Sequence, residues 1–199
     1  MTEELRPGAE SGPSQHMTII TPGSKSPAEL APIFHALFAG LERAHGAYNN
    51  ITLDQGRSDG KRKGTAVTKR EPVTDDLWAQ HLAGEYGIGI IPIRDDSTCV
   101  FGAIDVDVYA DLDPGRVAST VARMGLPLVV CRSKSGGVHL YAFSLAPVPA
   151  IQMQQKLQAI AARLGHGTCE VYPKQTVILT KEKDLGSWSA IEISFSTGV

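Results

Sequence analysis

Two aspartates two residues apart interrupt an apolar run near the middle of the chain, GAIDVDVY at residues 102–109. Side chains alternate between the faces of a strand, so a strand here would place Asp105 and Asp107 on one face and the valines in a core. Two half-buried carboxylates repel each other and lose hydration, and a divalent cation with oxygen ligands, Mg²⁺ or Mn²⁺, is the usual group that neutralises them. The alternative is a strand end at which water solvates both carboxylates.

Length and composition favour one folded domain with an extension. The chain has 199 residues, 42% of them hydrophobic, which is enough for a sizeable core. Residues 1–25 are rich in Pro, Gly, Ser and Glu, so we expect a disordered extension there and the folded domain over residues 26–199. No apolar run approaches the ~20 residues that span a bilayer, and no signal-peptide pattern begins the chain. We therefore expect a soluble, cytoplasmic protein with no membrane partner.

Charge and cysteine content exclude few classes of function. The net charge of −2 counts mildly against a dedicated nucleic-acid binder, which is often basic. Lys and Arg nevertheless gather among glycines over residues 57–70, which predicts a loop that is either merely solvated or in contact with phosphate groups. The three cysteines form no C-x-x-C pair, which argues against a disulfide framework and a zinc knuckle and favours buried free thiols.

Helices and strands alternate loosely along the chain. Ser26, Pro27 and Glu29 form a capping-box start, and the apolar stripe that follows predicts a helix ending near Gly46. Further helices are predicted over 75–83, 114–124 and 149–164, and strands over 48–53, 87–93, 99–108, 126–131, 138–145, 168–172 and 176–179. Residues 87–93 and 99–108 are interpreted as neighbouring antiparallel strands of one sheet. The fold class is therefore α+β, an antiparallel or mixed sheet with helices packed on it.

The segment CRSKSGGVH, residues 131–139, lies between two predicted strands. Its glycines let the backbone approach an anion, Arg132 and Lys134 supply positive charge, and Ser135 supplies a hydroxyl. Strand alternation directs His139 away from its apolar neighbours and toward whatever the loop binds. The alternative is an ordinary hairpin turn with a surface histidine. Carboxylates for a metal and cations for a phosphate together are what phosphoryl or nucleotidyl transfer requires.

A third acidic residue, Glu170, lies on a later predicted strand between Cys169 and Val171. The same alternation turns it away from its apolar neighbours. It is either a surface glutamate or a third carboxylate that completes the metal site.

The order of these motifs resembles the catalytic core of the archaeo-eukaryotic primase superfamily, the primase-polymerases. The similarity is closest to the bacterial and phage branch found in mobile-element conflict systems, and it covers roughly residues 48–188. It rests on GAIDVD (102–107), RSKSGGVHL (132–140) and EVYPKQ (170–175), and on the stretch from HLAG (81–84) to GIGIIP (87–92).

The resemblance implies an RRM-like catalytic sheet with a small N-terminal α/β module, all within residues 26–199. It implies synthesis of RNA or DNA from nucleoside triphosphates on a single-stranded DNA template, with a helicase, if one is needed, on a separate chain. Asp105, Asp107 and Glu170 would be catalytic and would bind Mg²⁺ or Mn²⁺. The residues implied to contact the nucleotide are Arg132, Lys134, Ser135, His139 and Lys174.

The chain departs from the family pattern in three places. Gly137 stands where many relatives have Ser, Glu170 stands where many have Asp, and residues 189–199 are interpreted either as an edge strand or as a truncated end. Two other functions remain open. One is a non-catalytic nucleotide- or nucleic-acid-binding relative of the primase fold; the other is a D-x-D glycosyltransferase, although its expected parallel βαβ start is missing.

Overall fold

The computed structural model describes residues 25–49, 65–107, 112–133, 136–178 and 190–193. Within these ranges the helices are α1 (Pro27–Leu37), α2 (Asp75–Leu82), α3 (Pro114–Arg123) and α4 (Ala150–Arg163). The strands are β1 (His45–Asn49), β2 (Thr65–Lys69), β3 (Gly87–Ile90), β4 (Thr98–Val106), β5 (Val129–Arg132), β6 (Val138–Pro149), β7 (Glu170–Tyr172) and β8 (Ile191–Glu192). None of the described helices is long and apolar enough to cross a membrane. Residues 1–24 of the expected extension and residues 57–64 of the predicted basic loop fall outside these ranges. The loop prediction is wrong for its second half, because Thr65–Lys69 form β2.

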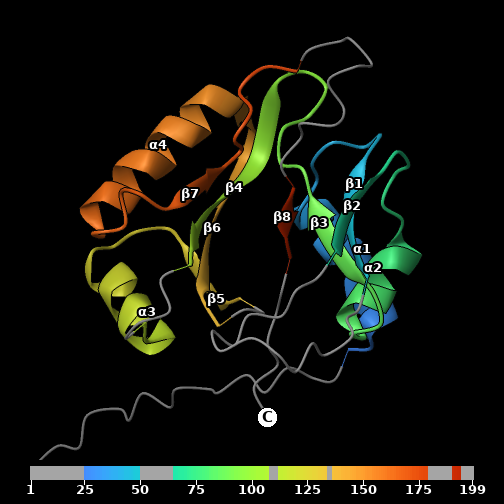
Figure 1. Cartoon of the computed structure of the whole chain (residues 1–199), viewed down its shortest axis with the longest axis horizontal. Helices are drawn as coiled ribbons and strands as arrows, with labels where there is room; N and C mark the ends of the chain where they lie inside the picture. Colours follow the sequence, from blue (N-terminus) through green and yellow to red (C-terminus); the bar gives the residue numbers. More distant parts are fainter. Residues whose placement is uncertain (1–24, 50–64, 108–111, 134–135, 179–189, 194–199) are drawn as a thin grey trace, which may run out of the picture.

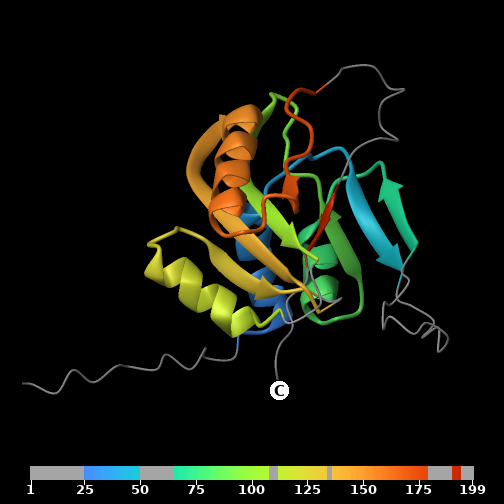
Figure 2. The ribbon, with the colours of Figure 1, turned by 60° about the vertical axis from the view of Figure 1, so that its left-hand side comes forward.

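The predicted α+β class is confirmed. The strands form a first sheet, in the order β2-β1-β3-β8, and a second sheet, in the order β5-β6-β4-β7, and every pairing within them is antiparallel. Chain order in the second sheet is β4-α3-β5-β6-α4-β7, the split βαβ arrangement of ferredoxin-like and RRM-like domains. Helices α3 and α4 cover one face of this sheet, and the first sheet with α1 and α2 lies on the other side (Figures 1 and 2).

One strand pairing was predicted wrongly. β3 and β4 belong to different sheets, although their apolar runs follow each other closely. Ile91 and Ile93, at the start of the connection, are buried in the same cluster as Ile104 of β4, and the chain reaches the surface only later, at Asp95 and Asp96. An apolar run shows that a strand is buried but not which sheet buries it.

The end of the first helix was also predicted wrongly. The capping box at Ser26 is present, but α1 ends at Leu37, and Gly46 lies in β1. Gly40 passes directly against the backbone of Ile91, where any Cβ would collide with the carbonyl oxygen, and the Leu41 N–H donates to that oxygen at 2.9 Å. The close approach of two backbones therefore ends the helix before its apolar stripe does.

The predicted edge strand near residue 191 is confirmed as β8, which pairs with β3 at the border of the first sheet. Ile191 and Ile193 are buried there, at 2% and 0% exposure. The α/β module that was expected to be N-terminal thus includes a strand from a much later part of the chain.

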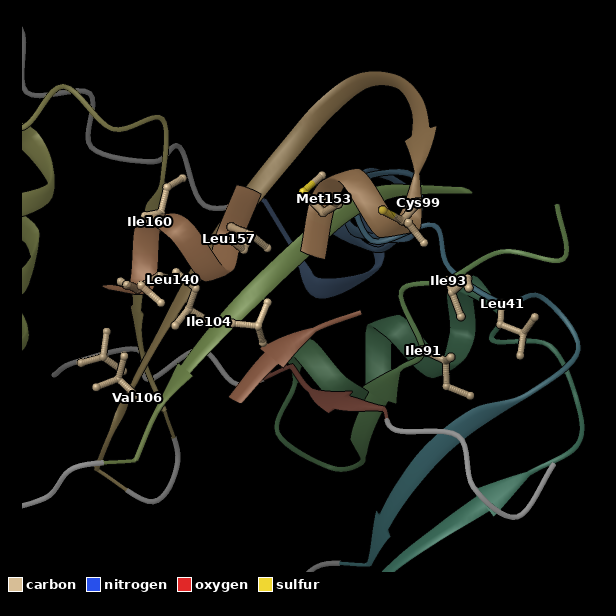
Figure 3. Packing of buried hydrophobic residues seen from close by; sticks show 14 of the residues in the cluster. Leu41, Ile91, Ile93, Cys99, Ile104, Val106, Leu140, Met153, Leu157 and Ile160 are labelled. Carbon is tan, nitrogen blue, oxygen red and sulfur yellow. The ribbon is translucent and has the colours of Figure 1, made fainter. Parts of the chain in front are cut away.

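Two apolar layers sandwich the second sheet. On one face Ile104, Leu140 and the α4 residue Leu157 belong to one buried cluster (Figure 3). On the other face Phe101 and Tyr141 meet the ring of Phe38, just after α1, at centroid distances of 5.1 and 5.3 Å. Asp105 follows Phe101 by four residues along β4, so strand alternation places it on the face away from α3 and α4.

Candidate functional site

Four chemically active residues lie in one row across the second sheet. Asp105 on β4 is directly opposite His139 on β6 and Glu170 on β7, and His139 is in turn opposite Cys131 on β5. Residues in register across neighbouring strands share a face, so all four belong to the face away from α3 and α4. The predicted orientation of His139 and Glu170, opposite to their apolar neighbours, is confirmed.

Asp105 and His139 form the buried part of this row. His139 Nε2 lies 3.3 Å from Asp105 Oδ1, and their side chains are 7% and 18% exposed. The contact lacks hydrogen-bond geometry, since Asp105 Oδ1 is buried and without a hydrogen-bond partner. A buried carboxylate oxygen in that condition is costly, on the order of 1–3 kcal/mol, and a cation that it coordinates would remove the cost. The oxygen donors here fit Mg²⁺ or Mn²⁺.

Tyr141 fixes the other side of the His139 ring. The Tyr141 hydroxyl and His139 Nδ1 are hydrogen bonded at 3.0 Å, and Tyr141 is fully buried. The Tyr141 ring meets Phe38 edge to face, so the module of the first sheet supports it. The imidazole is therefore positioned before any ligand arrives.

Glu170 lies on the side of Asp105 opposite to His139 and is held by two neighbouring side chains. Its Oε2 accepts a hydrogen bond from the Tyr172 hydroxyl at 3.0 Å and forms an ion pair with Lys174 Nζ at 2.8 Å. The ammonium also lies over the Tyr172 ring, 4.9 Å from the centroid. Burial, and then the adjacent Glu170 carboxylate, raise the pKa of the Tyr172 phenol, so it stays a donor.

This arrangement bears on the predicted metal ligands. In the described parts of the chain, no three His, Cys, Asp or Glu side chains are gathered tightly enough to hold a metal together. The Glu170 oxygen that could join Asp105 is instead directed at Lys174. A site that used Glu170 Oε2 would therefore have to displace Lys174.

Asp107 lies just beyond β4, against the turn that precedes β6. The Ser133 N–H donates to the Gly137 carbonyl at 2.9 Å, which closes the turn. A Cβ at Gly137 would lie 2.6 Å from the Val106 carbonyl oxygen, 3.1 Å from Ser133 Oγ and 3.3 Å from Asp107 Oδ1. The absence of serine at position 137 thus has a steric reason, and the buried Ser133 places a hydroxyl beside the same point.

The remaining predicted residues divide into two groups. Arg132 ends β5 and is exposed, and its register partner is Val138, so it occupies the alternate position to Cys131 and His139. It is thus not a member of the row. Lys134 and Ser135 fall outside the described residues.

Sequence reasoning missed Ser133, Tyr141 and Tyr172. A signal for the tyrosines was available, because each stands two residues after the side chain that it binds, in His139-Leu140-Tyr141 and in Glu170-Val171-Tyr172.

The predicted free thiols are confirmed. Burial raises the pKa of Cys99 to about 11, and burial followed by the Asp105 charge raises the pKa of Cys169.

Comparison with known proteins agrees with the motif order and the sheet topology. The family described as TOTE conflict system, Archaeo-Eukaryotic Primase domain, matches residues 45–194, from the start of β1 to just beyond β8. No curated protein matches the chain significantly. The matched segment contains both sheets and the whole row of Asp105, His139 and Glu170, and it covers far more than half of the sequence. The chain therefore belongs to the archaeo-eukaryotic primase domain family of TOTE conflict systems.

Proposed function

We propose that the chain is a metal-dependent nucleotidyltransferase that makes or extends nucleic-acid primers from nucleoside triphosphates on a single-stranded DNA template. The family supplies the primase-like fold. The observation that carries the proposal is the buried, unbonded oxygen of Asp105 beside a histidine that is already fixed in place.

Asp105 and Asp107 would hold the divalent cation, Mg²⁺ or Mn²⁺. Such a cation lowers the pKa of an attacking hydroxyl and stabilises charge on the transferred phosphate and the leaving pyrophosphate. Asp105 contributes an oxygen that already lacks a hydrogen bond, and Asp107 contributes an exposed carboxylate two residues later, at the mouth of the turn.

His139 would bind the triphosphate. Its Nδ1 is engaged by Tyr141, so Nε2 is the ring nitrogen that faces Asp105 and the ligand. Lys174 would move from Glu170 to a phosphate oxygen, which would release Glu170 toward the metal pair as the third carboxylate. Lys134 and Ser135, which lie outside the described residues, and Arg132, which ends β5 off the row, complete the nucleotide contacts that the proposal includes.

The test is primer extension and primer-free synthesis on single-stranded DNA, with labelled ribo- and deoxyribonucleotides and with Mg²⁺ or Mn²⁺. The double variant Asp105→Asn/Asp107→Asn should lose product by at least ~10³-fold, because two charged oxygens that face the reacting phosphate are replaced by neutral amides. Asp76→Asn, an exposed acid in α2, is the matched control and should keep full activity. Undiminished synthesis by the double variant, with an unchanged circular dichroism spectrum, would sink the proposal.

The second candidate is a non-catalytic nucleotide- or nucleic-acid-binding relative. It is favoured by one observation, the pairing of Glu170 with Lys174 instead of with the aspartates. It predicts triphosphate or DNA binding without product under either metal.

The antiparallel sheets argue against the glycosyltransferase, whose fold would be parallel. No feature of the described chain bears on a helicase partner, and the proposal does not include one.

A further inference from the structure

The two helices that cover the second sheet differ in charge from the two helices of the first sheet. Together α3 and α4 contain Arg116, Arg123, Lys156 and Arg163 and no acidic residue. Helices α1 and α2 contain three acidic residues, Glu29, Asp75 and Asp76, and no Lys or Arg. Among the described helices, every Lys and Arg thus lies on the two that cover the second sheet.

These four cations are exposed and unneutralised. None of them forms an ion pair within the described residues, and the hydrogen bond of Arg123 is a long one, 3.4 Å to Thr120 Oγ1. Exposed cations without carboxylate partners leave a positive potential that attracts polyanions.

The two cations of α4 lie on the side of that helix that faces α3. Gln154 donates to the carbonyl oxygens of Pro173 and Lys174, so its side of α4 faces β7. Lys156 and Arg163 are seven residues apart and share a stripe, which lies on the other flank of the buried residues, toward α3. Figure 1 shows both helices on this face of the molecule, with α3 beyond one end of α4.

A cavity of about 370 Å³ lies between α3 and the segment that follows α4, lined in part by Arg116, Thr120 and His166. We call this cavity and the helix surfaces beside it the groove; Arg116 lines the cavity, and the other three cations are exposed on the two helices. The carboxylate among its described lining residues, Asp113, accepts the Gly115 N–H at 2.9 Å and caps α3. The cavity therefore offers a guanidinium, an imidazole and a hydroxyl, which together suit a phosphate group.

The cavity opens at the end of the second sheet that carries the candidate site. Leu112, in its lining, follows Asp107 by five residues, and His166 precedes Glu170 by four. A nucleic-acid strand that leaves the site around this end of the sheet would meet the groove within a few nucleotides.

We propose that the groove between α3 and α4 is a second nucleic-acid surface, which binds the sugar-phosphate backbone through Arg116, Arg123, Lys156 and Arg163. It lies on the face of the sheet opposite to the row of Asp105 and His139. The inference rests on the proposed function only in taking the polyanion to be nucleic acid; the charge and the groove are independent of catalysis.

The test measures the affinity of the full chain for a fluorescent single-stranded DNA of about 20 nucleotides by anisotropy, at salt concentrations from roughly 50 to 200 mM. The groove variant carries Arg116→Gln, Arg123→Gln, Lys156→Gln and Arg163→Gln. Glutamine is a good helix former, so α3 and α4 should persist. The control variant, with Arg6→Gln, Lys25→Gln, Arg43→Gln and Arg94→Gln, removes the same charge outside these helices and outside the basic segment 57–70.

The groove variant should bind at least ~10-fold more weakly at the lowest salt, and the slope of log affinity against log salt should fall by about 0.7 for each phosphate that the variant no longer neutralises. The control should stay within about twofold of the wild type. Equal reductions in both variants, or no reduction in either, would overturn the inference. A membrane partner would also overturn the inference. In that case the wild type would bind vesicles of anionic lipid, the groove variant would not, and both would bind DNA equally well.

Failure of the proposed function has a different signature. In the Asp105→Asn/Asp107→Asn background the four groove substitutions should weaken DNA binding by the same factor as in the wild type, because neither aspartate lies in the groove. If the wild type makes no product but its DNA binding depends on the groove cations, the catalytic proposal fails and the groove stands.

Discussion

Asp105 has a neighbour on each side across the second sheet, and the two are supported in different ways. The His139 side chain is 7% exposed and is hydrogen bonded to a fully buried tyrosine. The Glu170 side chain is 58% exposed and is engaged by Lys174, itself partly in solvent. The first flank is built into the core, whereas the second consists of groups that water can replace.

Strand position explains the difference. β6 has a partner on either side, β5 and β4, and its Tyr141 packs on the aromatic cluster of the first-sheet module. β7 is a three-residue strand at the border of the sheet. One flank is therefore preorganised and the other is free to rearrange, which is the division expected of a site that must both position a ligand and release it.

The largest expected contrast is in activity. His139→Ala should lower primer synthesis by about 10²–10³-fold, because it removes a preorganised donor aimed at the phosphate. Glu170→Ala should lower it by about 10-fold or less if that carboxylate joins the site only transiently. The measurement is single-turnover extension with both metals. Equal losses would show that the two flanks are functionally equivalent.

Removing the hydroxyl of Tyr141 or of Tyr172 tests how much each flank contributes to the free energy of unfolding. Tyr141→Phe should cost about 1–3 kcal/mol in urea unfolding, since it leaves a buried imidazole nitrogen unpaired. Tyr172→Phe should cost less than about 1 kcal/mol, because Lys174 and water still satisfy Glu170. A larger cost for Tyr172→Phe than for Tyr141→Phe would reverse the assignment of the rigid flank.

The turn before β6 tests the same rigidity at the backbone. Gly137→Ala should destabilise the fold by about 1–3 kcal/mol, because the new Cβ would lie 2.6 Å from the Val106 carbonyl oxygen. The control is Gly115→Ala, whose nearest neighbour is the Asp113 side chain at 3.3 Å, and it should be close to neutral. Matching melting temperatures for the two variants would mean that the backbone of this turn shifts at little cost to accommodate a Cβ at position 137.

The smallest expected effect concerns the exposed ion pair. Lys174→Gln should change stability by less than about 1 kcal/mol, and salt should diminish the difference further, since solvent screens a pair this accessible. The check is unfolding at low and high salt. A loss of several kcal/mol would place Lys174 in the structural core of the site.

Local pattern predicted much of the site. Two-residue alternation correctly oriented His139 and Glu170, and the capping box correctly located the start of α1. The same alternation, applied to Cys131 and Arg132, would have shown that the arginine does not belong to the row.

What could not be predicted depends on contacts between distant segments. The separation of β3 from β4 into two sheets depends on the burial of Ile91 and Ile93, which no local pattern encodes. Glu170 and Lys174 are only four residues apart, but their pairing depends on the course of the chain after β7, which strand alternation does not give. Long-range packing outweighs local preference at such places.

The position of β8 has a consequence for the timing of synthesis. About one hundred residues separate β3 from the strand that completes its border. At a translation rate of about 5–20 residues per second, the ribosome would need some 5–20 s to supply them. During that interval Ile88 and Ile90 lack the cover of Ile191 and Ile193, and the open edge of β3 is available to any passing strand. The second sheet would thus be made in full while the first still awaits its last strand, so a newly made chain is most vulnerable to misassociation on the side opposite to α3 and α4.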